Sequence, residues 1–501
     1  MREQVAENRR REGFEMWLDR LLFHKQKVFA LWNSPTLMTF GSFTANALKL
    51  LVVLPLILTR LDTPEISIWY LFAAIITLQN LADIGFCPTF SRLIAYAMAG
   101  ASVHCLSGET IPKPQSSTAA PNWETIEAIC ATMRKIYEKL TVLLIALLLS
   151  LGTMSLIRPI AASSAPMEAW ISWGVIVLTS GVFLRGNAYR AFLEGTNQVA
   201  LIRRWDIYTA AGAAGTSIVA LLAGAGLLGL VLSQQGWMAL NVLRNRYLCR
   251  LFEGGRYRLF KDNSYSSELH RIAWPRAWRS SLGVFMSQGL IHASGLAYAQ
   301  LETSGRVASY LLGLRLVQAV SQFSQAPFYS KLPTLARLRA AGENDEQLHI
   351  AQRGMKFSYW SFVVAFVGIG MTATPLLSVI QSNADFPDPL MWSMLGVATL
   401  AERFGAMHIQ LYATTNRIIW HIANGVTGTI YLFASIILYP FIGVYAFPVG
   451  MIAGNLLFYD WYSASHSYKA FGMRFCKFEK KTALVPLIFM GVFLIFYLLE
   501  V

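Results

Sequence analysis

Residues 139–158 read KLTVLLIALLLSLGTMSLIR, and the eighteen positions between Lys139 and Arg158 carry no charged side chain. A helix that crosses a bilayer needs about 20 mostly apolar residues. Hydrophobic residues make up 55% of the 501 residues and charged residues only 14%, whereas soluble domains have about 25% charged residues. Thirteen segments are apolar and long enough, at 36–59, 66–87, 139–158, 169–193, 206–225, 227–243, 280–299, 307–330, 358–381, 390–413, 418–439, 441–462 and 483–499. The sequence therefore predicts an all-α polytopic membrane protein with about 13 transmembrane helices.

The distribution of Lys and Arg indicates how these helices are oriented. Residues 1–35 and every second loop after them hold 32 of the 42 Lys and Arg residues. The alternate loops hold only Arg60, Arg158 and Arg306. Because cytoplasmic loops are enriched in positive charge, the N-terminus is predicted to lie in the cytoplasm. Thirteen spans then place the C-terminus outside.

Residues 1–35 form a basic leader ahead of the first predicted span. Phe14, Trp17, Leu18 and Leu21 fall largely on one face of a helix, and Arg and Lys residues surround that face. This pattern predicts an amphipathic helix that lies on the anionic inner leaflet. A solvated basic tail is the alternative.

The predicted loops argue against an enzyme. The longest outer loops, near 159–168 and 382–389, are short, and the inner loops 99–138 and 244–279 contain no Gly-rich phosphate loop. No HExxH, GxSxG or CxxC motif occurs, and the five Cys residues show no paired spacing. We expect no catalytic residue, no metal and no cofactor. The formal charge of +14 then marks one side of a membrane, with no nucleic-acid partner.

Two stretches of the chain are repeated. Residues 61–63, LDT, correspond to residues 301–303, LET, and 88–95, PTFSRLIA, to 333–340, PTLARLRA. A weaker echo is the Thr-Asn pair after the fourth and the tenth spans. Each half begins and ends on the predicted cytoplasmic side, so the repeats are parallel and related by an axis along the membrane normal. The pattern predicts two six-helix lobes that form a V-shaped central cavity.

The expected units follow from this duplication. They are the cytoplasmic amphipathic leader at 1–35, an N-lobe of helices 1–6 at 36–249, a basic cytoplasmic linker at 250–279, a C-lobe of helices 7–12 at 280–465, and an extra C-terminal helix at 466–501.

Three short motifs resemble those of a known family. They are LADIG at 81–85 followed by RLIA at 92–95, FLEGTN at 192–197, and Pro333 with Arg337. In these the chain resembles the Wzx-type polysaccharide-biosynthesis flippases, which export O-antigen and other lipid-linked oligosaccharides. This family belongs to the multidrug/oligosaccharidyl-lipid/polysaccharide exporter superfamily. The resemblance implies two six-helix lobes, a wet cavity between them, and export across the bacterial inner membrane. A thirteenth helix departs from the family's twelve-helix core.

Charged residues inside the predicted spans mark the candidate substrate site. A Lys or Arg at the bilayer centre costs roughly 2.5–3.5 kcal/mol, so such side chains face water or a partner. Arg315, Gln318 and Gln322 share one helical face, which is typical of cavity lining and also of interhelical hydrogen bonding. The candidates for substrate binding are Lys49, Arg185, Arg190, Arg315 and Arg403.

Some of these charges have a structural alternative. Lys49 could pair with Asp83, and Arg190 with Glu194 at i,i+4. Arg185 has no obvious partner, and Glu402 and Arg403, being adjacent, are expected on different faces. Asp83, Glu402 and His408 are candidates for exchange of a coupling ion or proton. Aromatic residues expected mainly in interfacial belts are Trp69, Tyr70, Trp170, Trp173, Trp237 and Trp392.

A cationic cavity suits a phosphate-bearing or acidic-sugar substrate, because Arg binds both through two hydrogen bonds. The expected function is a secondary-type flippase for polyprenyl-pyrophosphate-linked oligosaccharide, acting by alternating access in surface polysaccharide synthesis (lipopolysaccharide O-antigen or exopolysaccharide). The expected partners are this substrate, membrane lipids, a coupling cation (proton or sodium) and other glycan-assembly membrane proteins. The alternatives are a cation-coupled multidrug extruder, an integral-membrane glycan polymerase or ligase, and a scaffold in a glycan-assembly complex.

Overall fold

The computed structural model describes residues 35–83, 85–103, 120–260, 264–329, 331–341, 343–415 and 419–499. Every regular element within these ranges is a helix. The expected leader helix lies outside the described residues.

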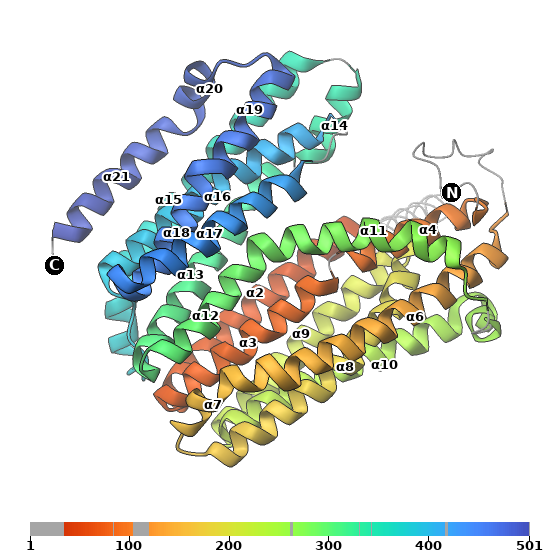
Figure 1. Cartoon of the computed structure of the whole chain (residues 1–501), viewed down its shortest axis with the longest axis horizontal. Coiled ribbons are helices and arrows are strands. Elements are labelled where there is room, and N and C mark those ends of the chain that lie inside the picture. The colour runs from red at the N-terminus through yellow and green to blue at the C-terminus, as the bar shows by residue number, and fades with distance from the viewer. Residues whose placement is uncertain are drawn as a thin grey trace, which may run out of the picture.

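The first half of the chain forms one group of helices, drawn from red to yellow-green in Figure 1. Helix α2 packs on α9, and α8 packs on α4, α6 and α10. The helices are α2 (Pro35–Arg60), α3 (Thr63–Asp83), α4 (Phe86–Met98), α6 (Trp123–Leu147) continued by η1 (Leu148–Gly152) and α7 (Thr153–Ala161), α8 (Pro166–Gly195), α9 (Val199–Leu222) and α10 (Gly226–Leu251).

The second half forms the other group, drawn in cyan and blue in Figure 1. Helix α13 packs on α15 and α16, and α16 packs on α18 and α19. The elements are α13 (Ser304–Tyr329), α14 (Leu332–Ala341), α15 (Asn344–Val379), α16 (Pro389–Ala413), α17 (Trp420–Ile442), η4 (Gly443–Tyr445), α18 (Ala446–Gly454), η5 (Asn455–Tyr459), α19 (Asp460–Phe471), α20 (Phe475–Thr482) and α21 (Leu484–Leu499).

The short helix η2 (Phe252–Leu259) follows α10 and packs on it. One bent helical run lies between the two groups. It consists of α11 (Ser267–Val284), η3 (Phe285–Gly289) and α12 (Leu290–Leu301). Helix α11 packs on α4 and also on α17, and α12 packs on α3 and α7. The run that was expected to open the C-lobe therefore contacts both halves. Figure 1 shows the two groups close together near α7 and α12, and farther apart toward α4 and α14.

The repeated motifs occupy equivalent places in the two halves. Residues 61–63 form the turn into α3, and residues 301–303 form the turn into α13. Helix α4, which carries the first Pro-Thr motif, follows α3 as α14, which carries the second, follows α13. Helices α3 and α13 also pack on each other and join the two halves.

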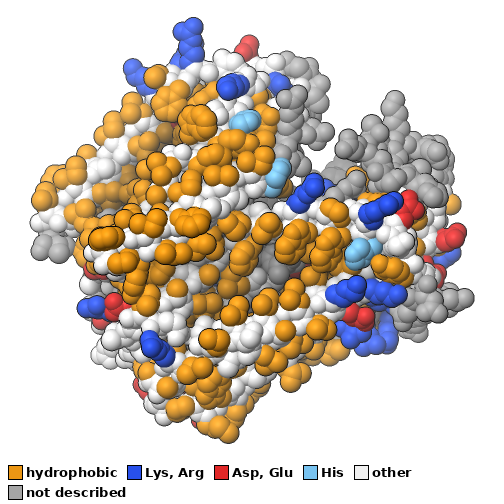
Figure 2. Space-filling view, in the orientation of Figure 1, with side chains coloured by type: hydrophobic (Ala, Val, Ile, Leu, Met, Phe, Trp, Pro, Cys, Tyr) orange, Lys and Arg blue, Asp and Glu red, His pale blue; other side chains and the backbone are white. Residues whose placement is uncertain are grey.

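In the described part of the chain, helix covers most of each predicted segment, and the segment 66–87 crosses the break between α3 and α4. Within the described residues, four helical runs are long and apolar enough to cross a membrane: Trp123–Ala161, Pro166–Gly195, Asn344–Val379 and Trp420–Phe471. The pair Phe475–Thr482 and Leu484–Leu499, bent by 62°, would be a fifth. The number of 13 spans stays a prediction. Figure 2 shows hydrophobic side chains over most of the visible face, with Lys and Arg gathered mainly toward its upper and right-hand ends.

Hydrogen bonds join the halves where the loop after α15 meets the turn between α2 and α3. The Asn383 N–H donates to the Leu58 carbonyl at 2.7 Å, and its Nδ2 donates to the Leu61 carbonyl at 2.9 Å. The Thr63 hydroxyl donates to the Asn383 carbonyl at 2.7 Å. We call these residues the Asn383 latch. It holds together the end that the charge pattern places outside.

Candidate functional site

A cavity of about 540 Å³ lies mainly within the second half. Its walls come from α13, α16, α17 and the α18–η5 run, and Thr77 of α3 contributes from the first half. The volume falls within the range of about 300–1,000 Å³ that is usual for small-molecule sites. This cavity is large enough to hold a ligand.

The predicted polar stripe of α13 faces this region. Gln318 and Gln322 line the large cavity, and Arg315 lines a second, smaller cavity of about 20 Å³ together with Tyr70 and His292. The small cavity has room for about one water-sized group. Gln318 and His292 line both cavities. Arg315, the cationic residue of the stripe, therefore lies beside the cavity that Gln318 and Gln322 line.

Lys49 of α2 and Arg315 of α13 form a pair of cations from the two halves. They interact as like charges, and both side chains are partly buried. Neither forms an ion pair with any carboxylate in the described part of the chain. The Arg315 Nε and the Tyr70 hydroxyl are buried without a hydrogen-bond partner. Because a buried cation without a partner is costly, this arrangement favours an anionic ligand.

Glu402 and Arg403 both line the large cavity, although as adjacent residues of a helix they point in different directions. Adjacent helical residues are about 100° apart, and the cavity is wide enough to reach both. Arg403 is 1% exposed. Its Nη2 donates to the Ser321 hydroxyl, whereas its Nε and Nη1 have no hydrogen-bond partner.

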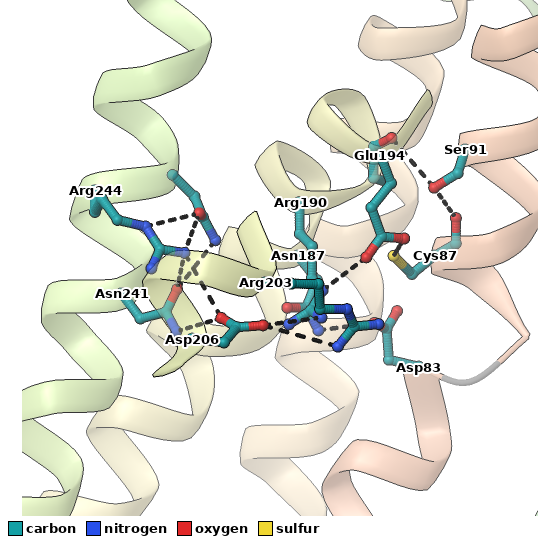
Figure 3. Close-up of polar contacts among 12 residues, drawn as sticks. Asp83, Cys87, Ser91, Asn187, Arg190, Glu194, Arg203, Asp206, Asn241 and Arg244 are labelled. Carbon is teal, nitrogen blue, oxygen red and sulfur yellow. Dashed lines mark hydrogen bonds and ion pairs between the residues drawn. The ribbon is translucent and has the colours of Figure 1, made fainter. Parts of the chain in front are cut away.

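Asp83 lies in the first half and is 8% exposed. Its Oδ1 accepts a hydrogen bond from the Tyr137 hydroxyl at 2.6 Å, and its Oδ2 accepts one from the Asn187 Nδ2 at 2.7 Å. Lys49 and Asp83 are both described, and no ion pair joins them. Asp83 thus ties α3 to α6 and α8, and Figure 3 shows its contact with Asn187.

Arg190 belongs to a charged network beside Asp83, which Figure 3 shows. The Arg190 Nε lies 3.0 Å from Glu194 Oε1, and its Nη2 lies 3.5 Å from Asp206 Oδ2. Arg203 and Arg244 each approach Asp206 at 3.8 Å. Carboxylates therefore neutralise Arg190 inside the first half, and it lines neither polar cavity.

Removing the shared carboxylate of this network is expected to destabilise the protein. In Asp206→Asn, three guanidinium groups lose their common counter-ion, and because these pairs are partly buried we expect a cost of up to about 3 kcal/mol, the lower end of the range for fully buried pairs. We expect the Tm of the purified protein to fall by roughly 5 °C or more, measured by thermal unfolding in detergent. The control is Glu138→Gln, which breaks an exposed pair and is expected to shift Tm by about 1 °C at most. Equal Tm values for the two variants would contradict this role of Asp206.

Arg185, for which the sequence shows no obvious partner, pairs with a carboxylate in the structure. Its Nη2 lies 2.7 Å from Glu138 Oε1 on α6, and its side chain is 68% exposed. It lines neither polar cavity. The partner is 47 residues away in sequence, so no local pattern could reveal it.

His408 is fully buried and contacts the C-terminal segment. Its Nε2 lies 3.2 Å from Glu479 Oε1 of α20. Glu479 also accepts hydrogen bonds from Tyr468 at 2.7 Å and from Thr482 at 2.7 Å. His408 therefore anchors α20 to α16 in this structure.

The sequence did not identify Tyr70 as a site residue. Of the aromatic residues expected in interfacial belts, Trp170 and Trp237 are partly exposed, whereas the other four have at most 6% of their surface exposed: Trp69, Tyr70, Trp173 and Trp392. Hydropathy could not distinguish a place in an interfacial belt from a place in the protein core, because an aromatic ring suits both. The nearest signal was the position of Tyr70 after the repeated Leu-acid-Thr motif, where Tyr310 stands in the second half. Tyr310 is also buried, at 1% exposed.

No protein-family model matches this sequence, and no curated protein matches it. Solved structures do share its fold. An inward-facing multidrug resistance MATE transporter of the MOP superfamily is 13% identical with a TM-score of 0.59, covering 89% of this chain and 100% of the other. The lipid II flippase MurJ, in an inward closed conformation, is 12% identical with a TM-score of 0.57, covering 92% and 98%.

An outward-facing MATE transporter is similar as well, at 12% identity, a TM-score of 0.50, and coverage of 90% and 98%. The chain thus shares the fold of these solved transporters, and its long apolar helical runs are typical of a multi-pass membrane protein.

Proposed function

We propose that this protein is a flippase that moves a polyprenyl-pyrophosphate-linked oligosaccharide from the cytoplasmic to the outer leaflet by alternating access. In this proposal it acts in surface polysaccharide synthesis, in a bacterial inner membrane, with its N-terminus in the cytoplasm. The anionic head enters between the two halves, and the polyprenyl tail stays in lipid. The coarser function, a membrane transporter or flippase, rests on the shared fold.

The observation that carries the proposal is the cation pair Lys49 and Arg315. These charges come from both halves and have no carboxylate partner among the described residues, and Arg315 lines a small cavity that shares Gln318 and His292 with the ligand-sized one. A phosphate group would supply the missing counter-charge and accept hydrogen bonds from the guanidinium. Arg185 and Arg190 have carboxylate partners, so we leave them out of the proposed site. Arg403 lines the large cavity but not the small one beside Arg315.

The experiment is reconstitution. Purified protein in liposomes is given a fluorescent polyprenyl-pyrophosphate oligosaccharide in one leaflet, and the transfer of its head group to the other leaflet is followed with a membrane-impermeant quencher. We expect transfer above that of protein-free liposomes. A rate equal to that of empty liposomes, with correctly folded protein, would overturn the proposal.

A second candidate is a cation-coupled drug extruder. Glu402 and the rings of Tyr329, Trp420 and Tyr459 line the large cavity, and carboxylate and aromatic groups attract cations. Cells that lack the protein would then show raised sensitivity to cationic drugs and unchanged glycans. The unpaired positive charge at Lys49 and Arg315 favours the first proposal.

The three candidates for exchange of a coupling ion, Asp83, Glu402 and His408, have different surroundings in the structure. Asp83 is held by Tyr137 and Asn187, and His408 by Glu479. Glu402 lines the cavity, so it is the candidate that we propose for a proton or sodium ion.

Alternating access predicts that the Asn383 latch opens during transport. The chain matches the inward-facing MATE structure better than the outward-facing one, with TM-scores of 0.59 and 0.50. The double variant Thr63→Ala/Asn383→Ala removes two of the three latch hydrogen bonds, each worth about 0.5–1.5 kcal/mol. The two bonds together are worth about 1–3 kcal/mol, so we expect the outward-open population to rise by about 5- to 150-fold.

Spin labels at the exposed Ile157 and Val379 would report this opening as a longer distance between the two labels in double electron–electron resonance. The control is Thr372→Ala, whose hydroxyl bonds only to the Gly368 carbonyl of its own helix. A distance distribution unchanged from that of the control would contradict a gating role for the latch.

A further inference from the structure

The large cavity differs in chemistry from the small cationic one beside it. Three glutamines of α13 line it at spacings of four and three residues, Gln318, Gln322 and Gln325, and Asn424 faces them from α17. Their side-chain amides have no hydrogen-bond partner within the described residues. An amide both donates and accepts hydrogen bonds, as a sugar hydroxyl does. These four side chains are therefore free to bind hydroxyl groups.

The ionisable groups of the large cavity balance each other. Glu402 and Arg403 are adjacent and of opposite charge, and His292 is the one further Asp, Glu, Lys, Arg or His residue among its lining residues. Arg403 Nη1 is buried, has no hydrogen-bond partner, and can donate to a hydroxyl. Tyr329, Trp420, Tyr431 and Tyr459 add rings with an apolar face and a polar edge. Such a lining suits a neutral, hydroxyl-rich ligand.

The two cavities share Gln318, His292 and Leu314. A ligand in the large cavity would have Arg315 just beyond the wall that the two cavities share, so an anionic part at that wall would lie nearest Arg315 and a neutral part would lie among the amides. The volume of about 540 Å³ limits the neutral part to a short head.

We infer that the large cavity is a sugar subsite that takes the short, uncharged head of a lipid-linked saccharide, while Lys49 and Arg315 take its phosphate. This rests on the proposed function and deepens it, because it assigns the negative charge of the substrate to the phosphate and none to the sugar. The second half of the chain then binds the sugar, mainly through Gln322, Gln325 and Asn424.

Binding to protein in nanodiscs tests this with three probes. They are polyprenyl pyrophosphate, the same lipid carrying an uncharged hexose disaccharide, and the same lipid carrying a disaccharide of uronic acids. In the wild type we expect the uncharged sugar to tighten binding over the bare lipid by about tenfold, and the uronic acids to give no such gain. Equal gains from the two sugars would overturn the assignment of an uncharged head.

The variant Gln322→Leu/Asn424→Leu removes two amides from the cavity. It is expected to lose the tenfold gain while binding bare polyprenyl pyrophosphate as the wild type does. The matched control is Gln234→Leu on α10, which lies outside both cavities and should keep the gain. A full gain in the double variant would overturn the subsite. If no probe with pyrophosphate binds at all, the proposed function fails, and binding of the free disaccharide still decides the sugar subsite.

Discussion

Replacing Arg315 with Ala is expected to abolish head-group transfer while the amount of folded protein stays normal. Arg315 lines the small cavity, and its Nε has no partner to lose. Removing an unpaired partly buried cation leaves no orphaned carboxylate, so the fold is not penalised. A charge-assisted, two-bond contact to phosphate would be lost, at about 1.5–3 kcal/mol per hydrogen bond. Two such bonds correspond to a fall in transfer rate of roughly 100-fold or more.

The measurement is the liposome transfer assay, with protein content and monodispersity checked for each variant. Arg315→Lys keeps the charge without the planar fork and is expected to retain partial activity. The control is Arg185→Ala, an exposed residue whose pairing with Glu138 is worth little, and it should transfer as the wild type does. Wild-type transfer by Arg315→Ala would remove this residue from the site.

The positions of the helices could be predicted because apolarity over about 20 residues is a local property of the chain. The polar stripe of α13 was predictable for the same reason, since Arg315, Gln318 and Gln322 share a face whatever packs against them. The partners of charged residues were not predictable in this way. Arg185 meets Glu138 from another helix, and only the packing of α6 on α8 brings them together.

The two halves treat their internal charges differently, although the sequence repeats between them. In the first half, Arg190, Arg203 and Arg244 surround Asp206, and Asp83 is held by neutral donors. Between the two halves, Lys49 and Arg315 have no such carboxylate partners in the described part of the chain. Neutralised charges hold helices together, whereas unpaired ones need water or a ligand. This contrast favours a structural role for the charged network around Asp206 and a binding role for Lys49 and Arg315.

Replacing Gly85 with Ala is expected to prevent most of the protein from folding. Gly85 lies between α3 and α4, and its N–H donates to the Ser281 hydroxyl at 3.2 Å. A Cβ at Gly85 would lie 2.0 Å from the Ala277 carbonyl oxygen and 2.6 Å from Ser281 Oγ. The first of these atoms is backbone of α11, so the clash is relieved only by moving that helix. Overpacking costs about 1–3 kcal/mol even where side chains can adjust, and here the cost is expected to be higher.

The readout for Gly85→Ala is the yield of monodisperse protein and its Tm after extraction in detergent. The matched control is Gly174→Ala on α8, where an added Cβ meets no atom within 4 Å. Ala is favoured over Gly inside a helix by about 0.5–1 kcal/mol, so the control is expected to be at least as stable as the wild type. Because α11 contacts both α4 and α17, moving it away from Gly85 would disturb the contacts of both halves. Wild-type yield and Tm in Gly85→Ala would show that α4 and α11 do not pack as closely as this structure has them.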